Sequence, residues 1–311
     1  IVYSEVYVNY RGQETLYGAG SGIIISKDGY IITNAHVAEN DYYTVTKLVV
    51  NVNTTDPNNG TSVSTAYEAD LLGSDTDTDL AVLKIKPDSD LPAAALGDSD
   101  KLSLGDDVVV IGNPLGLETS VSKGVVSGLN RQVYDDNSIS AIQTDTAINS
   151  GNSGGGLFNM NGELIGIVNA KSSSSDAEGL GFAIPINDAI KVAQDLLENG
   201  YVTGRPYMGI TYLAVTDAQT AAQLNVNAYG VYVVDVVQGG PADKAGLKTG
   251  DRIVSIDGTE IAQKDDLGTL IQQHAAGDTL SITVAREGQM QTVSLTLGEK
   301  NAQTQQAQKN S

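Results

Sequence analysis

A serine embedded in glycines is the first feature of this sequence that could do chemistry. It lies in the segment Gly151-Asn152-Ser153-Gly154-Gly155-Gly156. Glycine is costly in a folded backbone unless unusual dihedral angles or close approach are required. Acyl transfer creates such a requirement, because the attacking hydroxyl needs a tight turn and backbone N–H groups must point at the developing oxyanion. We therefore predict that Ser153 is a nucleophile and that the N–H groups of Gly151 and Ser153 stabilise an oxyanion. Taken alone, the segment also fits a flexible surface loop.

A histidine and an aspartate would complete the chemistry of such a serine. A serine hydroxyl is a weak nucleophile until an imidazole takes its proton. His36 ends the apolar run of residues 30–35, although an ordinary strand-end histidine would look the same. A carboxylate must hold the imidazole in its correct tautomer. Asp79 directly precedes the apolar residues 80–85, whereas Asp75 and Asp77 fit solvated loop or turn positions better. The order His, Asp, Ser along the chain is that of chymotrypsin-type enzymes, not of subtilisin or the α/β-hydrolases.

The composition excludes several classes of protein. The 311 residues are 41% hydrophobic and 18% charged, as in globular chains, and the length fits two domains. A net charge of −20 argues against binding to nucleic acid. The absence of cysteine excludes disulfides, a thiol nucleophile and Cys-ligated zinc. We expect no metal and no cofactor. The chain starts with Ile1 and holds no apolar run long enough to span a membrane, so we expect an N-terminal signal or membrane anchor to have been removed.

The elements that must position these residues are mostly short strands. Apolar runs bounded by turn residues predict strands over residues 21–26, 30–35, 48–52, 80–85, 108–111, 125–129 and 164–168. Asn161-Gly162 predicts a hairpin turn. A helix is predicted over residues 187–199, capped by Asn187 and ended by Gly200. After residues 203–206 the pattern restarts, with strands over 231–237, 251–256, 280–285 and 293–297 and a helix over 265–274.

Seven ordered motifs resemble the HtrA/Deg family of trypsin-like serine proteases. They are Gly20-Ser21-Gly22-Ile23, Thr33-Asn34-Ala35-His36-Val37, Thr78-Asp79-Leu80-Ala81-Val82-Leu83-Lys84, Ile111-Gly112-Asn113-Pro114, Gln143-Thr144-Asp145, Gly151-Asn152-Ser153-Gly154-Gly155 and Gly181-Phe182-Ala183-Ile184-Pro185. The resemblance implies a mainly β fold with two perpendicular β-barrels and a cleft between them. It also implies that His36 is the general base, that Asp79 orients it, and that Ser153 is the nucleophile.

The resemblance also implies a substrate pocket and reveals two departures. Ala147 and Ile148 would lie at the base of the P1 pocket, which predicts a preference for small or medium aliphatic residues; Ile148 also fits a plain core position. The strand Asn169-Ala170-Lys171 would pair with substrate backbone. Residues 171–176 resemble a regulatory loop or an ordinary one. Glycine at 156 and serine at 150 replace the prolines common in the family, which is expected to loosen the backbone beside the nucleophile.

The second half of the chain resembles a PDZ domain. The matching segments are Tyr207-Met208-Gly209-Ile210, Gly239-Gly240-Pro241-Ala242-Asp243-Lys244-Ala245-Gly246-Leu247 and Gly250-Asp251-Arg252-Ile253-Val254-Ser255-Ile256-Asp257-Gly258. Backbone N–H groups in such domains capture a peptide C-terminal carboxylate, and the peptide adds a strand to a sheet edge. We assign the carboxylate loop to Tyr207, Met208, Gly209 and Ile210. Leu267, Leu270 and Ile271 are expected to line the peptide groove or the core behind it.

These observations predict a protease domain over residues 1–200, a linker over 201–206, a PDZ domain over 207–298 and a disordered polar tail over 299–311. The predicted function is ATP-independent cleavage of unfolded proteins outside the cytoplasm, at the cell surface, in the periplasm or after secretion. The alternative is a chaperone or scaffold with a secondary protease site. The resemblance implies a homotrimer or larger homo-oligomer. Tyr3, Tyr7 and Tyr10 could supply the contacts, unless they are core residues.

Overall fold

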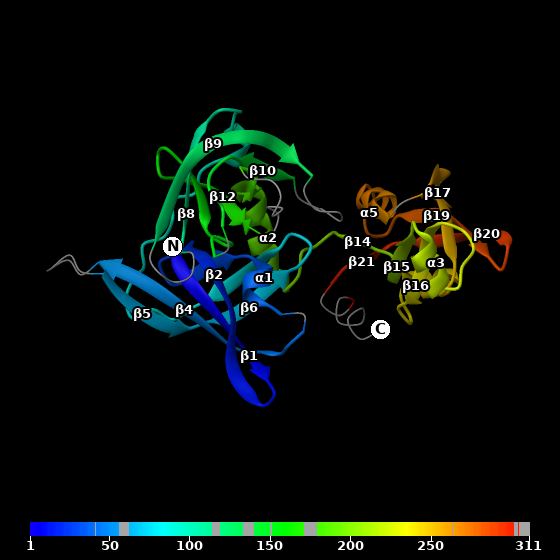
Figure 1. Cartoon of the computed structure of the whole chain (residues 1–311), viewed down its shortest axis with the longest axis horizontal. Coiled ribbons are helices and arrows are strands. Elements are labelled where there is room, and N and C mark those ends of the chain that lie inside the picture. The colour runs from blue at the N-terminus through cyan, green and yellow to red at the C-terminus, as the bar shows by residue number, and fades with distance from the viewer. Residues whose placement is uncertain are drawn as a thin grey trace. The chain divides into compact units, whose positions relative to one another are not determined.

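A computed structural model of the chain describes residues 1–40, 42–55, 62–113, 119–132, 140–149, 151–170, 179–262, 264–301 and 304. The chain divides into two compact units, Ile1–Tyr201 and Val202–Ser311 (Figure 1). Both units are built mainly from antiparallel strands. The predicted mainly β class, with a small α+β module in second place, is confirmed.

The first unit opens with an antiparallel sheet, here called the first sheet, whose strand order is β5-β4-β1-β2-β3-β7-β6. Its strands are β1 (Val2–Tyr10), β2 (Gln13–Ile24), β3 (Tyr30–Thr33), β4 (Val45–Thr55), β5 (Ser62–Glu68), β6 (Asp70–Asp75) and β7 (Leu80–Lys84). In β1 the residues Val2, Val6 and Val8 are buried, while Tyr3 and Tyr7 on the opposite face are half-buried. This two-residue period places the valines in the core and the tyrosines outside it.

A closed barrel, β10-β13-β12-β11-β8-β9, completes the first unit. Its strands are β8 (Asp107–Gly112), β9 (Ser120–Arg131), β10 (Ala141–Thr144), β11 (Gly156–Asn159), β12 (Leu164–Asn169) and β13 (Gly181–Pro185). Every residue of β12 is buried. The predicted turn at Asn161-Gly162 is confirmed, because it joins β11 to β12.

The described residues of the first unit include the helical segments α1 (Ala35–Ala38), the 3-10 helix η1 (Ser99–Lys101) and α2 (Ile186–Asn199). The sequence extended strand β3 through residue 35, but the strand ends at Thr33 and His36 lies on α1. The cap prediction for α2 was also wrong. Pro185 holds the N-cap position, and the Asn187 amide donates to Asp98 at 2.9 Å instead. Gly200 does end the helix, at a left-handed φ of 79°.

The second unit is a sheet with the order β15-β16-β17-β19-β20, with β18 beside β17 and a separate β14–β21 pair. Its strands are β14 (Pro206–Tyr207), β15 (Ile210–Val215), β16 (Gly230–Val236), β17 (Arg252–Ile256), β18 (Thr259–Glu260), β19 (Thr279–Arg286), β20 (Gln289–Thr296) and β21 (Gly298–Glu299). The helices are α3 (Ala218–Gln223), α4 (Pro241–Ala245) and α5 (Lys264–Gln272). Leu267 and Ile271 of α5 are buried in the core of this unit, and Leu270 packs against it. Across the described ranges, no helix is both long enough and apolar enough to cross a membrane.

Candidate active site

Asp79 is held in an unusual backbone conformation at the start of β7. Its φ of 55° lies in the left-handed region, which aspartate and asparagine adopt more readily than other non-glycine residues. The preceding turn is closed by Asp75, whose Oδ2 accepts the Thr78 N–H at 2.9 Å. The sequence placed Asp75 in a solvated loop or a turn; it forms the turn but is 2% exposed. The turn therefore fixes the position of Asp79 directly before β7.

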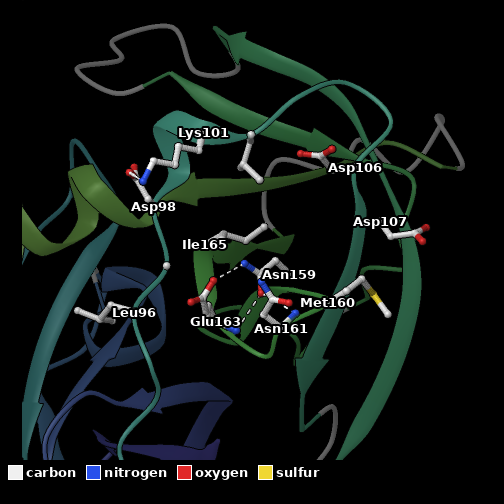
Figure 2. A pocket seen from close by; sticks show the side chains of 12 residues that line it. Leu96, Asp98, Lys101, Asp106, Asp107, Asn159, Met160, Asn161, Glu163 and Ile165 are labelled. Atoms are coloured by element: carbon white, nitrogen blue, oxygen red, sulfur yellow. Dashed lines mark hydrogen bonds and ion pairs between the residues drawn. The ribbon is translucent and has the colours of Figure 1, made fainter.

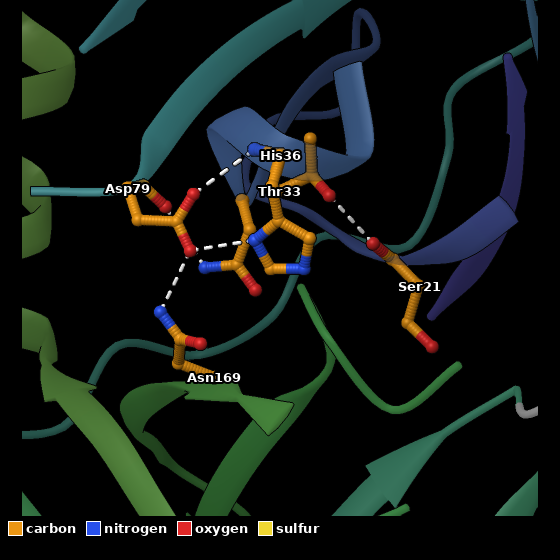
Figure 3. Close-up of polar contacts among 6 residues, drawn as sticks. Ser21, Thr33, His36, Asp79 and Asn169 are labelled. Carbon is orange, nitrogen blue, oxygen red and sulfur yellow. Dashed lines mark hydrogen bonds and ion pairs between the residues drawn. The ribbon is translucent and has the colours of Figure 1, made fainter. Parts of the chain in front are cut away.

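His36 and Asp79 are joined by a direct hydrogen bond. The His36 Nδ1 lies 2.6 Å from Asp79 Oδ2, and the His36 backbone N–H donates to Asp79 Oδ1 at 2.9 Å (Figure 3). The Asn34 amide donates to the Asp79 carbonyl at 2.9 Å. The carboxylate thus contacts both the ring and the backbone of the same histidine. A bond at Nδ1 leaves the other ring nitrogen, Nε2, to act as a base.

Asn169, at the end of β12, provides a third bond to the same carboxylate. Its side-chain amide donates to Asp79 Oδ2 at 2.7 Å, across 90 residues of sequence (Figure 3). Asn169 is 1% exposed, so this bond is sheltered from water. The sequence assigned Asn169 to a strand that pairs with substrate, and nothing in its local pattern signalled the contact with Asp79.

Ser153 lies at the junction between the first sheet and the barrel. Its carbonyl accepts the Ser21 N–H of β2 at 2.8 Å, and the next residue, Gly154, donates its N–H to the Val168 carbonyl of β12 at 2.9 Å. A Cβ atom on Gly20 would lie 2.6 Å from Val37 Cγ2 and 3.1 Å from the Ser153 carbonyl. Because Gly20 has no side chain, the turn at Ser153 and the Val37 side chain can both pack close to β2.

The His36 ring bonds to Asp79 alone within the described residues, and no hydrogen bond reaches the Ser153 hydroxyl. Ser153 is 6% exposed and the His36 side chain is 26% exposed. Catalytic hydrogen bonds often tighten only when substrate binds. The hydrogen bond between His36 and Asp79 is thus formed in this structure, while the Ser153 hydroxyl has no bonded partner among the described residues.

The predicted oxyanion donors lie on the tight turn that the sequence indicated. Gly151 has a left-handed φ of 95° and Gly154 one of 80°. Ser21 holds the turn from the first sheet, because its hydroxyl donates to the Gly151 carbonyl at 2.7 Å. Within the described part of the chain, no acceptor is bonded to the N–H of Gly151 or of Ser153. Both N–H groups therefore have capacity to bind an oxygen atom of a substrate.

The glycine at position 156 has a structural explanation. It opens β11 and pairs with Ile111 on one side and Ile167 on the other. A Cβ atom at this position would lie 2.4 Å from a ring carbon of Phe158. The Phe158 ring thus occupies the space that a larger residue at 156 would need, and strand pairing on both sides holds the backbone that was expected to be loosened. Ser150 lies outside the described residues.

The predicted substrate pocket is only partly described. Ala147 is exposed, and Ile148 is half-buried and packs against the barrel core. A Cβ on Gly181 would lie 2.5 Å from Ile148 Cδ1, so that glycine makes room for the isoleucine. Ala170 follows the end of β12, and Lys171 and the rest of the predicted regulatory loop, residues 171–176, lie outside the described residues.

The predicted carboxylate loop of the second unit leads directly into β15. Gly209 adopts a left-handed φ of 78°. The carbonyls of Met208 and Gly209 accept the N–H groups of Ala242 and Val237, both at 2.9 Å. Tyr207 is 6% exposed, and burial raises the pKa of its hydroxyl. These contacts fix the loop at the end of β15, which is a terminal strand in the order of its sheet.

A cavity of about 590 Å³ lies apart from all of these residues, at one end of the barrel (Figure 2). Three of the carboxylates in its lining are engaged. Asp98 accepts from the Asn187 amide, Glu163 accepts from Asn159, and Asp107 pairs with a lysine on β9. The Asn187 hydrogen bond, followed by Lys101, holds the pKa of Asp98 below its usual value. The volume of this cavity would suggest a binding site, but three of its lining carboxylates already have partners within the protein.

Comparisons with known proteins agree with the geometry. Residues 20–167 match the family described as trypsin-like peptidase domain, and residues 206–297 match the PDZ domain. The serine protease Do-like HtrA of Bacillus subtilis is 40% identical over 313 residues, covering 94% of this chain and 66% of the relative. A probable periplasmic serine endoprotease DegP-like from Hahella chejuensis is also 40% identical, covering 93% of this chain and 59% of the relative. The chain thus spans about three fifths to two thirds of the length of these curated relatives.

Solved structures give the same result. The HtrA-type protease AlgW, solved with a decapeptide, superposes with a TM-score of 0.63 at 33% identity, covering 96% of this chain and 94% of that one. The serine endoprotease of Yersinia pestis gives a TM-score of 0.63 at 34% identity with the same coverage. Together with the hydrogen bond between His36 and Asp79, these matches show that the chain belongs to the HtrA family of trypsin-like serine proteases.

Proposed function

We propose that the chain is a serine endopeptidase in which Ser153 attacks the substrate, His36 is the general base and Asp79 orients the histidine. The observation that carries the proposal is the 2.6 Å contact between His36 Nδ1 and Asp79 Oδ2. Nδ1 donates to a carboxylate, so Nε2 can accept the proton of a hydroxyl that approaches it. The nucleophile turn, held by Ser21 and Val168, supplies that hydroxyl.

The reaction proceeds through an acyl-enzyme. The Ser153 Oγ forms a bond to the scissile carbonyl carbon while its proton passes to His36 Nε2. The N–H groups of Gly151 and Ser153 stabilise the negative charge on the carbonyl oxygen. The carbon–nitrogen bond then breaks, and His36 returns the proton to the leaving amine. Water repeats the sequence to release the acid and restore the hydroxyl.

The proposed substrates are unfolded or misfolded proteins. A cleft of this type binds extended segments, and folded proteins expose few of them. Several relatives are named probable periplasmic endoproteases. We place the chain outside the cytoplasm and assign it a role in protein quality control. We also propose a homotrimer or larger homo-oligomer, which light scattering tests directly.

The second unit is proposed to bind peptide C-termini. A peptide can add as a strand beside β15, the terminal strand in the order of its sheet, while its carboxylate meets the loop Tyr207–Ile210. Support comes from the left-handed Gly209 and from the anchored carbonyls of the loop, which fix its orientation. The relative AlgW has been solved with a decapeptide. Isothermal titration with a peptide and with its C-terminal amide tests the assignment, since the amide should bind far more weakly.

Casein degradation and fluorophosphonate labelling test the protease assignment. Ser153→Ala should abolish labelling and lower turnover on the order of 10⁶-fold. Labelling with and without a C-terminal peptide also shows whether the PDZ unit controls the site. If the wild type and Ser153→Ala suppress aggregation equally and neither cleaves casein, the chaperone alternative replaces the protease.

A further inference from the structure

Three exposed tyrosines pack together at the turn end of the β1–β2 hairpin. Tyr10 is 43% exposed, Tyr17 51% and Tyr43 37%. The Tyr43 ring contacts both others, with centroids 5.7 Å from Tyr10 in an edge-on geometry and 5.7 Å from Tyr17. We call Tyr10, Tyr17 and Tyr43 the tyrosine cluster. It is an aromatic surface outside the core, and nothing in the mechanism above uses it.

The backbone is specifically shaped to present this surface. In the pairing of β1 with β2, Val6 faces Gly18 and Tyr7 faces Leu16, so Tyr17 is the extra residue of a β-bulge. A bulge re-aims the side chain of the residue that it inserts. Tyr43 is fixed separately, because Asn40 Oδ1 accepts its N–H at 2.7 Å. Three residues from two distant segments are therefore held in one place.

Strand β2 connects the tyrosine cluster to the nucleophile. Tyr17 precedes Gly20 by three residues in β2, which at ~3.3 Å per residue is about 10 Å. A Cβ on Gly20 would lie 3.1 Å from the Ser153 carbonyl, and Ser21 bonds to that carbonyl directly. The loop that carries Tyr43 follows the helix that carries His36. An extended substrate also advances about 3.3 Å per residue, so about three substrate residues would cover the length of β2 between Gly20 and Tyr17.

The position of the cluster within the first unit indicates which side of the scissile bond it would contact. The proposed acyl-side contacts, Ala147, Ile148 and the end of β12, belong to the barrel. The tyrosine cluster belongs to the first sheet, and the hairpin that carries it projects from the body of the unit (Figure 1). A polypeptide that crosses the active site from the barrel to the first sheet reaches the cluster with its leaving-group segment.

Resting on the proposed endopeptidase function, we propose that the tyrosine cluster binds an aromatic or large aliphatic side chain of the substrate, at the second to fourth residue after the scissile bond. Exposed rings offer edge-on and stacked contacts that favour another ring. Such side chains are buried in folded proteins and exposed in unfolded ones. The cluster would therefore favour substrates in which the segment after the scissile bond comes from a protein core.

The test is a pair of internally quenched decapeptides with valine before the scissile bond, identical except for tyrosine or glycine at the third residue after it. Wild type should cleave the tyrosine peptide roughly tenfold faster in kcat/KM, the range expected for one apolar side chain in a pocket. In Tyr17→Ala and Tyr43→Ala the two rates should become nearly equal. Tyr17→Phe should keep the preference, because the ring is retained.

Tyr229→Ala is the matched control, because it removes another exposed tyrosine, 59% accessible, from the second unit. Fluorophosphonate labelling of every variant separates failure of this proposal from failure of the active-site assignment. An undiminished preference for the tyrosine peptide in Tyr17→Ala, with labelling intact, would overturn the proposal. A change in molar mass on light scattering for the same variants would overturn it too, since the cluster would then be a contact between copies of the chain.

Discussion

Removal of the Asn169 side-chain amide offers the most direct test of how the catalytic carboxylate is held. The amide donates to Asp79 Oδ2 at 2.7 Å, and Asn169 is 1% exposed. A buried hydrogen bond to a charged group contributes about 1.5–3 kcal/mol. If that energy serves to hold the carboxylate against His36, Asn169→Ala should lower kcat about 10- to 150-fold. The effect should fall on kcat rather than KM, because the main chain at position 169 is unchanged.

The assay is steady-state cleavage of a quenched peptide, with thermal unfolding measured in parallel. Asn169→Asp should be worse than Asn169→Ala near neutral pH, because a second carboxylate would face Asp79 at hydrogen-bond distance. Asn161→Ala, in the exposed turn between β11 and β12, is the matched control and should retain wild-type kcat. A kcat for Asn169→Ala within twofold of wild type, in a folded protein, would refute the claim that this amide positions Asp79.

Three further predictions follow from the same contacts. Asp79→Asn should fold normally, since asparagine tolerates the left-handed φ of 55°, yet lose about 10⁴-fold in kcat through the wrong histidine tautomer; peptide kinetics and unfolding temperature check both parts. Gly154→Ala would place a Cβ 2.2 Å from the Ser21 carbonyl, so fluorophosphonate labelling should slow at least about 100-fold; normal labelling would show that the turn can rearrange. Arg286→Met removes the partner that pairs with Asp251 at 2.6 Å, and the Asp251 side chain is only 1% exposed. The variant should destabilise the second unit by about 3 kcal/mol in denaturant unfolding, because a buried charge is left unpaired. Adding Asp251→Asn to the same chain should restore part of the lost stability.

The chemistry of the site could be read from the sequence because it depends on residue types in order. A serine between glycines, a histidine after one apolar run and an aspartate before another are local patterns. Turns are equally local: Asn161-Gly162 joins β11 to β12, and Gly200 ends α2. Periodicity and turn chemistry act over a few residues, so one window of sequence contains the information.

Local patterns failed where a side chain outside the window determined the outcome. Asn187 looks like a helix cap, but it lies in the first turn of α2. Its side chain bonds to Asp98, which is 89 positions away in the sequence. Asp75 fits a solvated loop or a turn position; it does form the turn after β6, but its own side chain is buried. His36 follows an apolar run that resembles strand, but the chain turns into α1 where His36 meets Asp79.

The sequence alone predicted the reaction class and the mainly β composition, and the proposed catalytic groups and their order also come from it. The tertiary structure decided which groups support them. Asn169 reaches Asp79 across 90 residues, and Ser21 reaches Gly151 across 130. Tyr17, the extra residue of a bulge in β2, contacts Tyr43 of a separate loop. Such contacts leave no periodic trace, since their energy depends on distances that exist only after the first sheet and the barrel have packed together.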